Sequence, residues 1–312
     1  MRRVRHTVNG GPEVLFVEDV PAPEPGTGEL LIRVEAVGVS LAGVRRVRGG
    51  EPGPLGGEVA GTVEALGPDT AGSGFAVGDR VTGICFGHGY AELALLDAAM
   101  ASRVPEGATA VDAVSLVRSG LVARGALDAA RLRPGESVLV TGAASGVGQL
   151  AVPLARLLGA GRVVAAAGSP DKAAFLRGLG ADEVVGYGPE DAGRSWGEPV
   201  DVVLDAVGGD LLPRALAALA PGGRLVAFSS GGGTVPAHGL LAGATSVIGF
   251  QMAHLARTRP RDHAAWRDDL WALHAAGRLA PAVHARVPLA RAAEAHAIIE
   301  RRENLGKVVL VP

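Results

Sequence analysis

Hydrophobic and polar positions follow one pattern up to about residue 120 and another after it. In the first part, short β-rich runs such as LLIRVEAVGVS (30–40) and GEVAGTVEALG (57–67) are separated by Gly and Pro. Charged residues such as Arg33 and Glu35 alternate with apolar neighbours, which is typical of an antiparallel strand with one exposed face. The pattern predicts a small β-barrel or β-sandwich.

From Glu136 the pattern changes to compact apolar runs that alternate with helical periodicity. Strands are expected at 137–142, 162–169, 183–187, 199–207 and 223–230, and helices at 147–160, 171–181 and 211–220. Strict alternation of strands and helices predicts βαβ units around a buried parallel sheet. From about His263 the chain is again helical, and it ends in the apolar run KVVLV (307–311).

Composition narrows the possible functions. The chain has 312 residues, 48% hydrophobic and 20% charged, which excludes extended disorder and favours two domains. A net charge of -2 provides no basic field for a polyanion, so we expect a small-molecule ligand and no nucleic acid.

The single cysteine, Cys85, excludes an intramolecular disulfide and any multi-cysteine metal site, and it favours a reducing cytoplasm. The longest uncharged stretch, 231–256, is interrupted by Gly and Pro, so we expect no membrane segment there.

The segment VLVTGAASGVGQ (138–149) predicts a dinucleotide-binding loop because a strand ends in a tight glycine turn that opens into a helix. Gly142 permits the turn, Gly146 lets the backbone approach a pyrophosphate, and Gly148 allows close helix packing. Backbone N–H groups at the helix start would then hold the phosphates. The candidate binding residues of the loop are Gly142, Ala143, Ser145, Gly146, Val147 and Gly148.

The end of the next strand indicates which cofactor is bound. An NAD enzyme places Asp or Glu there, about 20 residues on, whereas this strand ends in Ala167, Gly168 and Ser169. Ser169 and Lys172 can hold a 2′-phosphate, so NADPH is predicted. The alternative is that Ser169 caps the following helix and Lys172 is solvated.

These segments carry a family resemblance that covers nearly the whole chain. It is shown by VEAVGVS (34–40), GGEVAGTVEALGPD (56–69), VGDRV (77–81), GYAEL (89–93), GAASGVG (142–148), GGRLVAFSS (222–230) and GKVVLV (306–311). The sequence resembles zinc-free medium-chain dehydrogenases/reductases of the quinone oxidoreductase group, which includes zeta-crystallin and enoyl reductases. The resemblance implies an α/β fold: a GroES-like β-barrel catalytic domain at 1–120, completed by 263–312, and a doubly wound parallel-sheet Rossmann domain at 121–262.

Zinc-dependent relatives have a cysteine and a histidine at two positions that are Ser40 and Gly57 here. Neither residue replaces a thiolate or an imidazole as a zinc ligand, so no metal is expected. Glu58 then remains as a structural acid or a proton relay, and Cys85 as a small apolar residue or a reactive thiol.

Quinone reductases typically have Asn and then an acidic residue after the VGV run, where this chain has Ser40, Gly43 and Arg45. The candidate catalytic residues are Ser40, as hydrogen-bond donor, and Arg45, as cation for an oxyanion. Alternatively, Ser40 bonds to nearby backbone and Arg45 points to solvent. His88 is a possible proton donor or an ordinary loop residue. Arg118 is expected either to contact an acidic substrate or the cofactor phosphates, or to form an interdomain salt bridge.

The resemblance also implies further cofactor contacts. Val207 would pass the ribose, and Tyr187 would lie beside the adenosine phosphate or simply pack in the core. Candidate contacts to the nicotinamide side or the phosphates are Phe228, Ser229, Phe250, Gln251 and Asn304, the last being equally compatible with a helix cap. The run TSVIGF (245–250) resembles the edge strand through which this family forms homodimers.

The leading functional hypothesis is an NADPH-dependent, zinc-independent oxidoreductase that transfers hydride to a quinone or an α,β-unsaturated carbonyl compound. One alternative is an enoyl-thioester reductase of polyketide-type metabolism. The other is a non-catalytic nucleotide-binding protein, since the usual Asn and acidic residue are replaced.

Overall fold

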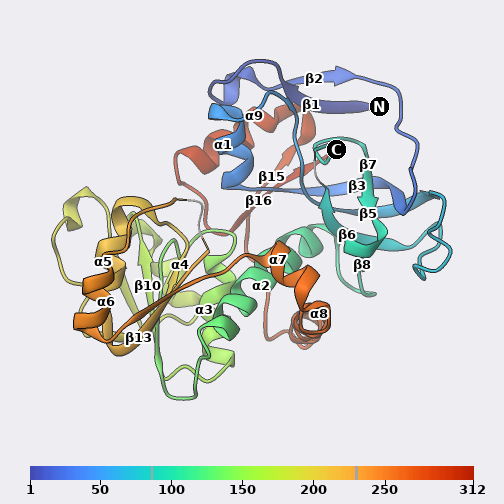
Figure 1. Cartoon of the computed structure of the whole chain (residues 1–312). Helices are drawn as coiled ribbons and strands as arrows, with labels where there is room; N and C mark the ends of the chain where they lie inside the picture. Colours follow the sequence, from blue (N-terminus) through green and yellow to red (C-terminus); the bar gives the residue numbers. More distant parts are fainter. Residues whose placement is uncertain (86, 229–230) are drawn as a thin grey trace. The chain divides into compact units, whose positions relative to one another are not determined.

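A computed structural model describes residues 1–85, 87–228 and 231–312 of the chain (Figure 1). The chain forms two compact units: unit 1 comprises residues 1–118 and 281–312, and unit 2 comprises residues 119–280. No helix in the described part of the chain is long and apolar enough to cross a membrane.

Unit 1 is built mainly of antiparallel strands. Its strands are β1 (Arg2–His6), β2 (Phe16–Asp19), β3 (Glu29–Val39), β4 (Gly53–Pro54), β5 (Gly57–Leu66), β6 (Arg80–Cys85), β7 (Leu93–Asp97), β8 (Ser102–Arg103), β15 (Val283–Pro288) and β16 (Lys307–Val311), and its helices include α1 (Leu41–Gly49), α9 (Ala292–Glu300) and the short η1 (Pro12–Val14). The larger sheet has the order β15-β16-β3-β5-β6-β8, with β7 also paired to β3. The C-terminal strand β16 therefore completes the sheet begun by the N-terminal segment.

Strand β3 explains why this sheet forms. Leu30, Ile32 and Val34 alternate with more exposed neighbours and are almost completely buried. Burying each such side chain stabilises the fold by about 1.5–3 kcal/mol. The last residues of β3, from Ala36 to Val39, are buried on both faces, and α1 begins directly after Ser40.

Unit 2 contains a parallel sheet with helices between its strands. The strands are β9 (Ser137–Val140), β10 (Arg162–Ala167), β11 (Glu183–Gly186), β12 (Val200–Asp205), β13 (Leu219–Ala227) and β14 (Ser246–Gly249), and the helices include α3 (Gly148–Leu157), α4 (Ala173–Gly178), α5 (Leu212–Ala217), α6 (Ala237–Gly243), α7 (Met252–Thr258) and α8 (Pro260–Ala275). The order is β11-β10-β9-β12-β13-β14, and every pairing is parallel. This is the doubly wound order of a Rossmann fold, so the predicted α/β class is confirmed.

The position of α8 differs from the sequence expectation that the chain returns to the first domain from His263. Helix α2 (Ala110–Ala129) carries Gly120 and Gly125, and the absent side chains make room for residues of α8. A Cβ added at Gly120 would lie 2.9 Å from Leu270 Cδ1, and one added at Gly125 would lie 2.9 Å from Trp266 Cζ3. Because this apolar face packs on α2, α8 belongs to unit 2, and the chain returns to unit 1 only at Pro281.

Candidate functional site

The order of the strands in unit 2 reverses at β9, which has β10 on one side and β12 on the other. In open α/β sheets the crevice at such a switch point, outside the carboxyl ends of the strands, is where ligands bind. The glycine loop 141–147 follows β9 there, and the loop 206–208 follows β12. The structure therefore brings the predicted phosphate loop to the position where a dinucleotide site is expected.

Within the loop, Gly142 and Gly148 have different structural roles. Gly142 has a φ of +59°, a backbone conformation that residues other than glycine rarely adopt. A Cβ at Gly148 would lie 2.6 Å from Ala143 Cα, so only glycine lets α3 start this close to the loop. Gly146 and Val147 are half-buried and lie immediately before α3. The first backbone N–H groups of a helix point out of its N-terminal end, toward this place.

Two other residues of the loop already have partners inside the protein. The N–H of Ala143 donates to the carbonyl of Ala166 at 3.1 Å, and Ala143 is fully buried. The Ser145 hydroxyl accepts the N–H of Gly148 at 3.1 Å and so caps α3. Ala143 and Ser145 therefore help to shape the loop, and the contacts of the loop with phosphates stay a prediction.

Asp205, at the end of β12, is a residue that the sequence reasoning did not single out. Its buried carboxylate accepts the Thr141 hydroxyl at 2.8 Å and the N–H groups of Val207 and Gly208 at 3.1 and 3.2 Å. Thr141 in turn accepts the N–H of Ala206 at 2.9 Å. These hydrogen bonds connect the loop after β9 with the loop after β12. In the sequence, the only sign of this role of Asp205 is a carboxylate at the end of an apolar strand.

At the end of β10, Tyr187 and Gly168 lie in contact. A Cβ at Gly168 would be 3.2 Å from Tyr187 Cε2, so the tyrosine ring packs over the glycine. The Ser169 hydroxyl donates to the carboxylate of Asp171, which lowers the pKa of that carboxyl, and the charge of Lys172 lowers it further. The predicted 2′-phosphate residues Ser169 and Lys172 are therefore neighbours, with a carboxylate beside them.

The remaining predicted cofactor residues lie at several places. The N–H of Phe228 donates to the carbonyl of Asp205 at 3.2 Å, which puts Phe228 at the switch point. The Phe250 ring packs against Gly125 of α2, and Gln251 is exposed directly before α7. Asn304 is buried in unit 1, where its side-chain amide donates to the carbonyl of Gly306 at 2.9 Å. Ser229 lies outside the described residues.

In unit 1 both predicted catalytic residues belong to α1, one at its N-cap and one within it. Ser40 is the N-cap of α1, and its hydroxyl oxygen accepts the N–H of Gly43 at 3.3 Å. Arg45 is exposed on the same helix. A Cβ at Gly43 would be 3.6 Å from the Tyr90 hydroxyl oxygen and 3.9 Å from Ser40 Oγ, so Tyr90 borders the space that this glycine leaves open.

Tyr90 forms a buried hydrogen bond that the sequence analysis missed. Its hydroxyl lies 3.1 Å from Nε2 of His296 on α9, and both side chains are fully buried. Burial raises the pKa of Tyr90 and lowers that of His296 to about 4, so neither group is charged at neutral pH. No sequence signal connects residues 206 positions apart.

Glu58 is the centre of an ion cluster in unit 1. One carboxylate oxygen accepts Arg118 Nη1 at 2.7 Å, and the other accepts Lys307 Nζ at 3.1 Å. Glu58 and Lys307 are almost completely buried, whereas the Arg118 side chain is 38% exposed. Burial opposes ionisation, yet the two cations hold the pKa of Glu58 at about 2, and burial lowers the pKa of Lys307.

The cluster bears on two of the alternatives considered for single residues. Arg118 does form a salt bridge with Glu58, but both residues belong to unit 1, so this bridge is not the interdomain one that was expected, and the ion pairs of Glu58 fit a structural acid. Elsewhere, the exposed His88 ring lies 3.4 Å from Arg3, and burial together with that cation lowers its pKa. Cys85 is buried, and burial raises the pKa of its thiol, which favours the interpretation of Cys85 as a small apolar residue. Across the described residues, no group of three or more His, Cys, Asp or Glu side chains is arranged to hold a metal ion.

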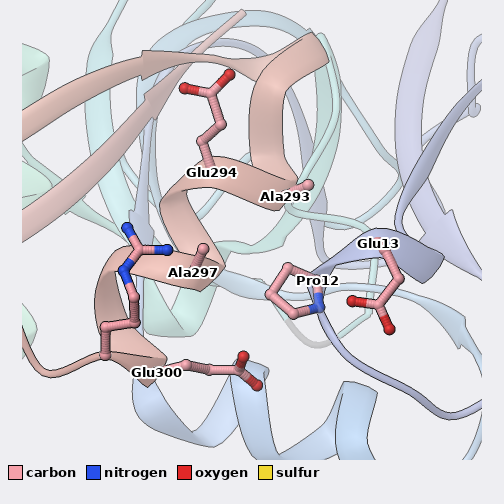
Figure 2. Close-up of a pocket in the computed structure, with 7 residues that line it drawn as sticks. Pro12, Glu13, Ala293, Glu294, Ala297 and Glu300 are labelled. Atoms are coloured by element: carbon pink, nitrogen blue, oxygen red, sulfur yellow. The ribbon is translucent and has the colours of Figure 1, made fainter.

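A hollow of about 420 Å³ lies on unit 1 between η1 and α9. Figure 2 shows Pro12 and Glu13 facing Ala293 and Ala297 across it. Glu300 also lines the hollow, and its carboxylate accepts a hydrogen bond from Arg48 Nε at 2.6 Å. Because its lining differs from the residues of the glycine loop and of the ion cluster, this hollow is not part of the candidate site.

Comparisons with known proteins agree with this arrangement. Residues 26–106 match the family model of the alcohol dehydrogenase GroES-like domain, and residues 179–310 match that of zinc-binding dehydrogenases. The chain is 33% identical to a quinone oxidoreductase of Pseudomonas aeruginosa, over 100% of this chain and 99% of that protein. It is 31% identical to a 2-haloacrylate reductase of a Burkholderia species, over 97% and 96%.

A polyketide synthase of Streptomyces halstedii contains a segment 36% identical to 91% of the chain, but the chain spans only 5% of that synthase. Among solved structures, a mycobacterial protein complexed with NADPH is 35% identical, with complete coverage of both chains and a TM-score of 0.91. The Escherichia coli quinone oxidoreductase complexed with NADPH is 27% identical, with complete coverage and a TM-score of 0.90.

Proposed function

The chain belongs to the quinone oxidoreductase group of the medium-chain dehydrogenases/reductases, and from this membership we propose that it is an NADPH-dependent reductase of quinones or α,β-unsaturated carbonyl compounds that works without zinc. The observation that carries the proposal is the glycine loop, which lies at the point where the parallel strand order reverses.

The residues of unit 2 fit NADPH. A Cβ at Gly148 would collide with the loop backbone, so the start of α3 lies against the loop that would hold the pyrophosphate. Gly146 and Val147 would contact the pyrophosphate, and Lys172 would pair with the 2′-phosphate. Asp171 would repel that phosphate, so the preference for NADPH depends on Lys172. The two solved relatives bound to NADPH support this assignment.

When bound, NADPH supplies a hydride, which the β-carbon of an enone or a quinone carbon accepts. The chain's own contribution is to bind and polarise the acceptor. The Ser40 hydroxyl accepts the Gly43 N–H and still has its proton to donate to a substrate carbonyl oxygen. Such a donor stabilises the negative charge that develops on that oxygen. Arg45, exposed one helical turn further on, would add positive charge.

Zinc independence is supported by the residues at the two ligand positions. Ser40 caps α1, and Gly57 has no side chain. The neighbouring carboxylate of Glu58 is bound to a cation through each of its oxygens. The groups present here are a hydroxyl and a carboxylate that is already paired with two cations, and they do not form the ligand set of a zinc centre.

The test is NADPH oxidation by the purified protein with a benzoquinone, cyclohexenone and crotonyl thioester as acceptors. We expect turnover with a quinone or the enone, and the same rate after prolonged treatment with a strong zinc chelator. Tight NADPH binding without oxidation by any acceptor would refute the proposal and favour a nucleotide-binding protein. Loss of activity on chelation, restored by zinc, would refute zinc independence.

A second candidate is an enoyl-thioester reductase, which the similarity to part of a polyketide synthase favours. Preference for the crotonyl thioester over the free enone by a large factor in kcat/KM would support it.

We further propose a reducing cytoplasm as the compartment, since Cys85 is the single cysteine, and a homodimer joined through β14, the edge strand of the parallel sheet.

A further inference from the structure

Arg118 is a charged residue in a segment of α2 that is otherwise buried. The five residues before it, Ala113 to Val117, and the residue after it, Ser119, are each at most 8% exposed. A guanidinium in such a place costs free energy unless it is paired or used. Arg118 is paired with Glu58. The charge of Glu58 is already balanced by Lys307, so this pairing alone does not require an arginine at position 118.

The cluster carries one more positive charge than negative. Glu58 provides one negative charge, and Lys307, which is almost completely buried beside it, already balances that charge. Arg118 adds a second positive charge while remaining 38% exposed. Only Nη1 contacts Glu58, and a guanidinium has five N–H donors in a fixed fork. A half-exposed surplus cation with donors to spare is suited to an anionic ligand.

The register of the sheet places Glu58, the carboxylate that holds this cation, near Ser40. Glu58 lies opposite Gly38, and a Cβ at Gly38 would be 2.5 Å from Glu58 Oε2. Ser40 is two residues further along the same extended chain, so its side chain projects from the same face, about 7 Å away. Lys307 immediately precedes Val308, which lies opposite Val39. The Ser40 hydroxyl, which is proposed to bind a carbonyl, and the Glu58 carboxylate, which binds Arg118, therefore lie on one face of unit 1.

We propose that Arg118 binds the carboxylate of the substrate and that the substrates include short α,β-unsaturated carboxylic acids. This inference rests on the proposed reductase function and specifies its substrate class. Glu58, itself held by Lys307, is a positioning residue that fixes the guanidinium. Ser40 and Arg118 would each bind one oxygen of the same carboxylate.

Reduction of an unsaturated acid explains why a cation is needed there. Hydride from NADPH forms a C–H bond at the β-carbon, the C=C π electrons move toward the carboxylate, and NADP⁺ is released. The resulting enediolate carries two negative charges on its oxygens, and a proton from water at the α-carbon then gives the saturated acid. A fixed guanidinium stabilises the second charge, which an ester or a ketone does not develop.

The experiment compares crotonate with its neutral methyl ester in NADPH oxidation by the wild type, Arg118→Gln and Arg118→Lys. We expect Arg118→Gln to lower kcat/KM for crotonate about 100-fold, equivalent to about 2.7 kcal/mol, and to change that for the ester less than about twofold. Arg118→Lys keeps the charge but not the fork, so we expect an intermediate loss of about 10-fold. The matched control is Arg124→Gln, which removes an arginine from the same helix.

A second measurement does not depend on turnover. Calorimetric titration with butyrate, in the presence of NADP⁺, reports binding of the saturated product, and we expect Arg118→Gln to lose it while Arg124→Gln retains it. Equal losses for crotonate and its ester, or unchanged butyrate binding, would overturn the inference and leave Arg118 a structural residue. Wild-type turnover of benzoquinone without turnover of crotonate or binding of butyrate would overturn the inference but not the proposed function. Binding of butyrate through Arg118 without oxidation of NADPH by any acceptor would support the recognition site and refute the reductase.

Discussion

Replacing Lys307 by methionine should destabilise unit 1 more than any change of a surface charge. The Lys307 side chain is 4% exposed, and its ammonium group lies 3.1 Å from the carboxylate of Glu58, whose side chain is 3% exposed. Lys307→Met therefore leaves a buried charge with one of its two partners. Breaking a buried pair in this way typically costs about 3–5 kcal/mol. Because Arg118 remains bound to the other oxygen, we expect the lower end, about 3 kcal/mol.

The acidity of Glu58 agrees with this direction. Its pKa of about 2, against an ordinary 4.5, corresponds to a stabilisation on the order of 3 kcal/mol at neutral pH, to which Lys307 and Arg118 both contribute. Since the pKa is lowered in the folded state, this stabilisation is fully present above pH 4.5 and is lost as the pH falls toward 2. Lys307→Met raises the pKa of Glu58, so the variant should lose less stability than the wild type over the same acid range.

The assay is urea unfolding followed by circular dichroism at pH 7 and at several pH values below 4.5, without cofactor. The control is Lys172→Met, which removes the chain's other lysine from a half-exposed position and should change the free energy of unfolding by less than about 0.5 kcal/mol. Adding Glu58→Gln to Lys307→Met should restore part of the lost stability, because the buried charge is gone. A loss below about 1 kcal/mol, or a double variant less stable than Lys307→Met, would refute the reasoning.

Three predictions concern the cofactor and substrate sites, and one concerns assembly. Gly146→Asp should abolish NADPH binding in a fluorescence titration, because a carboxylate would repel the pyrophosphate; retained affinity would mean that the loop is wrongly assigned. Lys172→Ala should weaken NADPH about 10-fold and leave NADH affinity unchanged, and equal effects on both would contradict the 2′-phosphate contact. Ser40→Ala should lower kcat about 10–100-fold, whereas a purely capping role would cost only about 1 kcal/mol of stability. Sedimentation equilibrium should give twice the chain mass of 31.4 kDa, and a monomer would contradict pairing through β14.

Much of unit 2 was predictable because its signals are local. The apolar runs around Val138 and Val203 and the glycine turn at Gly142 each require a particular conformation within a few residues. The strand order then followed from the family resemblance. The position of α8 was not predictable in this way, because it depends on Gly120 and Gly125, whose missing side chains matter only when two helices meet.

The polar clusters of unit 1 were beyond local reasoning. The sequence offered Glu58 as a structural acid or proton relay and Arg118 as a ligand contact or salt-bridge residue, but nothing in it indicated that Lys307 binds the same carboxylate from 249 positions away. The Tyr90–His296 bond is equally distant in sequence. Such contacts are specified by strand register and burial, which a single sequence pattern does not contain.

The glycine at position 57 also bears on any attempt to build a metal centre into this scaffold. A Cβ there would lie 3.0 Å from the carbonyl oxygen of Gly38 and 3.5 Å from the Tyr90 ring. A histidine introduced at Gly57 would thus enter the space beside a ring that is held by His296. Combining it with Ser40→Cys would not be sufficient, because the backbone carbonyl of Gly38 leaves less room than an ordinary contact for a Cβ at position 57. A zinc centre in this scaffold is therefore opposed by the packing around position 57 as well as by the residues at the two ligand positions.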